Sequence, residues 1–148
     1  MTAQPQPPQA PPPRLLAVDP GEQRTGLAVS DDLGLYAHTR PAIIARGDDA
    51  IVEAVAMAAL REGAAEVIVG LPLSLAGGDT AGARHARLLA AAIARRTGLP
   101  VRCWDERLSS VEAARGLAAR RHRTGELDSR SAAVILQAAL DERWRRTP

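Results

Sequence analysis

The chain has 148 residues and a formal net charge of +2, which suits one domain with a buried core and is too short for two lobes of catalytic size. All 19 basic residues are arginines, so a Walker-type phosphate lysine, a Schiff-base lysine and a Ser-Lys dyad are excluded. Phe is absent and only three residues are aromatic, so Ala, Val, Ile and Leu must fill the interior.

The first residues and the single cysteine bear on domain organisation and location. Residues 1–13 have almost nothing apolar to bury, so we expect a flexible Pro/Gln-rich tail ahead of one domain over residues 14–148. A proline motif that binds a partner is the less favoured alternative for this tail. Cys103 has no partner for an internal disulfide, and no apolar run reaches membrane-spanning length, so we expect a cytoplasmic protein without a membrane segment.

Two short apolar runs after the tail predict a β-hairpin. The run LLAVD from Leu15 reads as a buried strand, PGEQRTG as a turn and LAVSD as the second strand. A third strand is predicted over Leu35–Thr39 or slightly beyond.

Beyond residue 47 the pattern alternates between helix and strand. An acidic start, apolar residues at Ile51, Val55 and Ala58 and a closing Gly63 predict a helix. The run EVIVG then predicts a buried strand, residues 81–97 predict a helix that stops before the sequence GLP, and VRCW predicts the last strand.

Two helices are predicted to close the chain. Ser109 with Glu112 forms a capping-box signature for a helix that runs toward His122, and a last helix is predicted from near Asp128 to Arg145. Hairpin turns allow only antiparallel pairing, whereas helical crossovers give parallel neighbours. The element order therefore predicts an α/β fold with a mixed five-stranded sheet, three antiparallel strands plus two parallel ones, flanked by helices.

Acidic residues stand at the ends of three predicted elements, and each also has an ordinary structural explanation. Asp19 ends an apolar strand, where a half-buried carboxylate needs a partner, but it could equally cap the following turn. Asp105 and Glu106 leave the last strand toward opposite sides, so only one is expected to reach a site. Either of them could instead pair with Arg107 or help a helix to start. Asp128 stands at the mouth of the last helix, where N-capping explains it.

These carboxylates could converge into a site for a hard cation, because their oxygens favour Mg²⁺ and Mn²⁺ over zinc. The histidines His38, His85 and His122 have no metal-ligand spacing and are more typical of surface or phosphate-contacting residues. From the residues alone, a structural role and metal binding both remain open for each acid.

Four segments, in order along the chain, resemble the motif regions of one known family. They are VDPGEQRTGLAVSD, VIVGLPLSLAG, DERLSSVEA and LDSRSAAVILQAALD, and they extend from about Leu15 to the last helix. They resemble the YqgF/RuvX family, whose members are described as Holliday-junction resolvases or pre-16S rRNA nucleases and which is placed in the ribonuclease H-like superfamily. That superfamily agrees with the predicted element order.

The resemblance implies a metal-dependent endonuclease whose acidic cluster is Asp19 of DPG, Glu106 of DER and Asp128 of LDS, and it favours Glu106 over Asp105. It implies two-metal hydrolysis, with Mg²⁺ or Mn²⁺ ions about 3.5–4 Å apart. Asp19 would bridge the two ions, while Glu106 and Asp128 would each complete the coordination of one.

Phosphate contacts are expected from arginines and from the loop over residues 72–80. Gln23 stands where the family often has a basic residue, so other arginines are expected to replace it. Because binding should come chiefly from phosphate contacts, affinity is expected to fall steeply with salt. Few aromatic residues imply little base stacking, so the substrate is expected to be branched or helical. The expected substrate-binding residues are Arg24, Arg107, Arg120, Arg121, Arg123, Ser74 and Thr80.

The sequence leaves the substrate and two other functions open. A four-way DNA junction and a precursor rRNA both fit, and a two-fold homodimer would suit symmetric junction cleavage. One alternative is a non-catalytic nucleic-acid or ribosome-associated module of the same fold, against which the presence of all three acids argues. The other is a nucleotide-binding domain of actin-like type, because DPGEQRTG also resembles the phosphate loop of such domains; the single-domain length argues against it.

Overall fold

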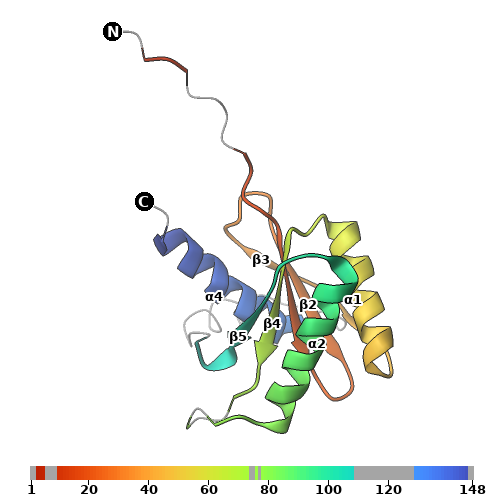
Figure 1. Ribbon diagram of the computed structural model, residues 1–148. Helices are drawn as coiled ribbons and strands as arrows, with labels where there is room; N and C mark the ends of the chain where they lie inside the picture. Colours follow the sequence, from red (N-terminus) through yellow and green to blue (C-terminus); the bar gives the residue numbers. More distant parts are fainter. Residues whose placement is uncertain (1–2, 6–9, 74–75, 77, 109–128, 147–148) are drawn as a thin grey trace.

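The computed structural model describes residues 3–5, 10–73, 76, 78–108 and 129–146, and a five-stranded sheet forms its centre (Figure 1). The strands pair in the order β3-β2-β1-β4-β5, with antiparallel pairing among the first three and parallel pairing from β1 to β4 and from β4 to β5. The predicted mixed sheet is therefore confirmed. The strands are β1 (Leu15–Pro20), β2 (Thr25–Ser30), β3 (Ala37–Ile43), β4 (Glu66–Leu71) and β5 (Val101–Asp105).

Helices cover both faces of the sheet (Figure 1). Helices α1 (Asp48–Glu62) and α2 (Ala81–Thr97) pack on one face, and α4 (Arg130–Arg146) packs on the other. Alternate residues of a strand point to opposite faces, so Leu16 and Val18 join the core under α1 and α2, whereas Leu15 and Ala17 join the core under α4. None of the helices in the described ranges combines the length and apolar character needed to cross a membrane.

The first two helices have the predicted bounds, whereas the third strand does not. Gly63 and Gly98 end α1 and α2 in the left-handed conformation, with φ of 65° and 71°. Strand β3 begins at Ala37 rather than at Leu35 and extends beyond Thr39, so the prediction for this strand was displaced. The cause is Asp31, whose carboxylate accepts the backbone N–H groups of Leu35 and Tyr36, at 2.8 Å and 3.3 Å, and holds both residues in a turn.

The last helix begins at Arg130, close to the predicted start. Its apolar face packs on the sheet, since Ala132, Ile135, Leu136, Ala139 and Leu140 are all buried. The helix predicted from Ser109 toward His122 lies outside the described residues, and so does Asp128.

Ser129 attaches the start of α4 to the sheet through a fully buried side chain. Its Oγ accepts the backbone N–H of Leu27 at 3.0 Å and donates to the carbonyl oxygen of Arg40. Ser129→Ala would leave both backbone groups without this partner, so we expect it to lower the free energy of unfolding by about 1–3 kcal/mol in urea titrations. Ser131→Ala removes an exposed hydroxyl from the same helix and is expected to change stability by less than about 0.5 kcal/mol. Equal losses in the two variants would contradict this role for Ser129.

Candidate active site

Asp19 and Glu106 meet at the edge of the sheet where β1 and β5 end. Asp19 follows Leu15 and Ala17 on the side of β1 that α4 covers, because alternate strand residues share a face. Glu106 follows the buried Trp104 in the same way and opens a short 3₁₀ turn (Glu106–Leu108). The two side chains form a hydrogen bond with each other. The described structure thus brings together two of the three acids that the sequence motifs indicated.

Gly70 of β4 provides the space that this acid pair occupies. A Cβ atom at position 70 would lie 3.0 Å from Oε1 of Glu106, 3.5 Å from Oδ1 of Asp19 and 2.7 Å from Cδ1 of Ile135 in α4. Any larger residue would therefore press on both the acid pair and the helix. Gly70 was predicted only as part of a strand, although a glycine inside an otherwise β-branched run is a known sign of close approach.

Burial of Asp19, together with the hydrogen bond to Glu106 and the negative charge of Glu106, raises the pKa of Asp19 to about 8, and burial is the largest of these causes. Two neighbouring carboxyl groups in a half-buried position cannot both ionise cheaply, so one proton stays on the pair at neutral pH. A bound divalent cation would replace that proton. Carboxylate oxygens are the donors that Mg²⁺ and Mn²⁺ prefer, so these residues fit such an ion. Within the described ranges no cluster reaches three metal-ligating side chains.

Asp105 is engaged elsewhere. Its carboxylate accepts hydrogen bonds from the Arg107 guanidinium at 2.5 Å and 2.9 Å, and this interaction lowers the pKa of Asp105. The adjacent acids Asp105 and Glu106 therefore have different partners. Arg107 is exposed, and it would have to share or leave Asp105 in order to contact a phosphate.

The other predicted substrate-binding residues have different outcomes. Thr80 is the N-cap of α2: its Oγ1 accepts the N–H of Ala83 at 3.0 Å and donates to the carbonyl oxygen of Pro72 at 2.7 Å. Its hydroxyl thus shapes the loop after β4. Arg24 is exposed in the turn between β1 and β2 and lines a cleft. Ser74, Arg120, Arg121 and Arg123 lie outside the described residues, as does the third acid, Asp128.

This sheet order, with helices on both faces, places the chain among proteins of the ribonuclease H-like fold. The same fold is found in the structure of Thermus thermophilus RuvC in complex with a Holliday junction substrate, with a TM-score of 0.67, 17% sequence identity and coverage of 91% of this chain and 98% of that chain. A second Thermus thermophilus RuvC structure gives a TM-score of 0.64 at 16% identity, covering 89% of this chain and 96% of that chain. At these identities the likeness concerns the fold alone.

The chain belongs to the RuvX family, because the model of that family, described as Holliday junction resolvase, matches residues 13–142. A relative from Anaeromyxobacter dehalogenans (strain 2CP-C), named "Putative pre-16S rRNA nuclease", is 42% identical over 135 residues, covering 88% of this chain and 98% of the relative. A relative of the same name from Acidiphilium cryptum (strain JF-5) is 44% identical over 133 residues, covering 86% of this chain and 84% of the relative. The family indicated by the four sequence segments is therefore confirmed.

Proposed function

We propose that the protein is a divalent-metal-dependent endonuclease that hydrolyses phosphodiester bonds in structured nucleic acid. The observation that carries this proposal is the Asp19–Glu106 pair, in which burial and mutual repulsion hold a proton that a cation would displace. Such a site is costly for a protein to keep, because a half-buried acid pair that no cation of the described residues neutralises lowers stability. Membership of a family described as Holliday junction resolvase supports the assignment.

Each described residue at the site has a proposed role. Asp19 and Glu106 would hold the metal through their carboxylate oxygens, and Gly70 leaves the room that these two carboxylates occupy. Mg²⁺ or Mn²⁺ bound there would supply an activated water and stabilise the leaving oxygen. Asp128 is proposed as the third ligand. In support, Ser129 is bonded to Leu27, the residue after Gly26, which is the register partner of Asp19.

Precursor 16S rRNA is the substrate that the relatives favour, because their shared name refers to it and the chain matches most of their length. A four-way DNA junction is the second candidate, since the family description refers to Holliday junctions. We propose 5′-end processing of precursor 16S rRNA as the first candidate activity and junction cleavage as the second.

The proposal is tested by incubating the purified chain with a structured precursor rRNA fragment and with a four-way DNA junction, in Mg²⁺, in Mn²⁺ and in chelator. We expect cleavage of at least one substrate with metal, none with chelator, and products that carry a 5′-phosphate and a 3′-hydroxyl, because the leaving group is the 3′-oxygen. Cleavage that persists in chelator, or products with 3′-phosphates, would contradict the proposal. Failure to cut either substrate with either metal would instead favour the non-catalytic module.

A further inference from the structure

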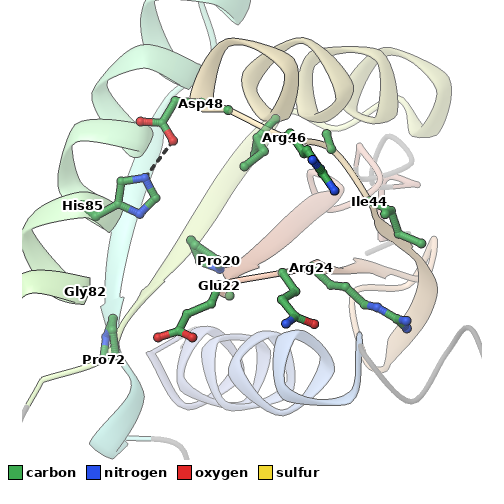
Figure 2. Close-up of a pocket in the computed structure, with 14 residues that line it drawn as sticks. Pro20, Glu22, Arg24, Ile44, Arg46, Asp48, Pro72, Gly82 and His85 are labelled. Atoms are coloured by element: carbon green, nitrogen blue, oxygen red, sulfur yellow. Dashed lines mark hydrogen bonds and ion pairs between the residues drawn. The ribbon is translucent and has the colours of Figure 1, made fainter.

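An open cleft of about 940 Å³ lies beside the acid pair, on the side of the sheet that α1 and α2 cover. It is bounded by the turn between β1 and β2, by the loop that leads into α1 and by the first turns of α2 (Figure 2). Figure 2 shows that charged side chains from all of these segments border the same space. The charged and ionisable residues among them are Glu22, Arg24, Arg46, Asp48 and His85.

The charged groups of the cleft differ in their partners. Arg46 is exposed and forms no ion pair or side-chain hydrogen bond with any residue of the described ranges. Asp48, in contrast, is bound by Nε2 of His85 at 2.8 Å, across the gap between α1 and α2. This contact offsets the charge of Asp48 when the imidazole is protonated, and it orients the His85 ring at the rim. Glu22 is the remaining acid of the lining, and it too forms no ion pair or side-chain hydrogen bond with any residue of the described ranges.

The cleft and the acid pair lie near the same edge of the sheet, on opposite faces. Pro20, which lines the cleft, directly follows Asp19 in β1. Pro72, which also lines it, comes just after β4, two residues from Gly70. Consecutive Cα atoms are only about 3.8 Å apart. A polymer that leaves the cleft over the edge of the sheet at Pro20 would therefore come close to the acid pair on the other face.

The size and chemistry of the cleft fit one unpaired strand. Pockets of about 300–1,000 Å³ hold small ligands, so this cleft has room for a few nucleotides and not for a double helix. No Phe, Tyr or Trp is among its lining residues, so bases would not be held by aromatic stacking. Arginine, in contrast, presents a fork of donors that suits phosphate oxygens.

We infer that this cleft binds an unpaired stretch of the substrate strand, next to the phosphodiester that is cut, and that Arg46 and His85 contact its phosphates. The inference rests on the proposed nuclease function for its biological meaning. It assigns a binding role to Arg46, which the sequence did not indicate, and a specific place to His85, which the sequence left between a surface and a phosphate-contacting role. It also defines the substrate class: a helical element joined to an unpaired strand, rather than a continuous duplex.

The test measures binding without cleavage, in chelator, by fluorescence anisotropy with labelled hairpins that share one stem. One hairpin is blunt, one has an unpaired RNA extension and one has an unpaired DNA extension. We expect the wild-type protein to prefer an extended hairpin to the blunt one. Arg46→Ala should weaken binding of the extended hairpin by about tenfold and reduce the slope of log affinity against log salt by about one, as loss of a phosphate contact predicts.

Arg61→Ala is the matched control, because Arg61 is an exposed arginine at the other end of α1, about 20 Å away at 1.5 Å per residue. This variant is expected to keep the wild-type preference. Tighter binding of the RNA extension than of the DNA extension would support the inference with RNA as the ligand, and equal binding would support recognition of phosphates alone.

Equal affinity of the wild-type protein for blunt and extended hairpins would overturn the inference, as would a preference that survives Arg46→Ala. Neither result would bear on metal-dependent cleavage. Conversely, absence of cleavage in the earlier assay would remove the nuclease proposal while a cleft-dependent preference for unpaired strands could still be measured. The two failures are therefore distinguishable.

Discussion

Asp19→Asn is expected to lower the rate of cleavage by about a thousandfold or more, as removal of a group in the reacting centre does. The same substitution is expected to stabilise the metal-free protein at alkaline pH. The two effects have one cause. The carboxylate that would hold the cation is also the group whose ionisation the fold opposes, because it is half-buried beside Glu106. Asparagine keeps the shape and hydrogen-bonding capacity but carries no charge.

The direction of the pH dependence follows from the pKa of Asp19, which is about 8 in the fold and 3.8 in the unperturbed side chain. Between these values the folded state binds more protons than the unfolded state, so stability falls as pH rises. The contribution of Asp19 is fully present below about pH 4 and is lost by about pH 8. The variant and the wild-type protein should therefore be equally stable near pH 4 and differ by about 1–4 kcal/mol at pH 8.

The measurement is urea unfolding in chelator at a series of pH values, repeated with Mg²⁺. Added Mg²⁺ should raise the free energy of unfolding of the wild-type protein and not that of Asp19→Asn, because only a ligand that binds the folded state stabilises it. Asp105→Asn is the matched control: Asp105 has a lowered pKa and pairs with Arg107, so this variant should show no gain at pH 8. Parallel stability curves for Asp19→Asn and the wild-type protein would exclude the strained acid pair.

The fold could be predicted from the sequence because its periodicities are strong and local. Successive residues of β1, such as Leu15 and Leu16, join the cores on opposite faces of the sheet. The first helix ends at Gly63, a glycine with positive φ. The predicted bounds of β3 were displaced because the start of this strand depends on hydrogen bonds that the Asp31 carboxylate accepts from the backbone. Such bonds leave no periodic signal in the sequence.

The acid pair was predictable in outline, whereas its surroundings were not. Parallel pairing of β1, β4 and β5 brings their carboxyl ends to one edge, so Asp19 and Glu106 could be expected to meet there. The elevated pKa of Asp19, by contrast, depends on burial depth and on a contact between side chains 87 positions apart in the numbering. No single segment of sequence contains that information.

The cleft could not be found from the sequence at all. Arg46 lies in a loop between β3 and α1 that has no periodic pattern, and it borders the cleft together with His85 of α2. The His85–Asp48 contact forms only because α1 packs beside α2. The three histidines were assigned to the surface or to phosphate contacts from their spacing alone, and the structure distinguishes His85 among them by its place at this rim.

Gly70→Ala is expected to lower cleavage by about a hundredfold, because a displacement of about 1 Å in a reacting group has that order of effect. The added methyl group would lie 3.0 Å from Oε1 of Glu106, so the carboxylate must move away from its present position. The same methyl group would lie 2.7 Å from Cδ1 of Ile135, so α4 must also shift or the side chain must rotate. Overpacking of this kind costs about 1–3 kcal/mol in the free energy of unfolding.

A second substitution separates these two effects. Ile135→Val deletes the Cδ1 atom that the new methyl group would strike, at an independent cost of about 0.5–1.5 kcal/mol. In the double variant, Gly70→Ala should therefore destabilise much less than it does alone, as a double-mutant cycle of urea midpoints would show. Cleavage should remain low, because the clash with Glu106 is unchanged. If the double variant recovered both stability and cleavage, Gly70 would act only through the packing of α4, and its place beneath the carboxylates would have no bearing on catalysis.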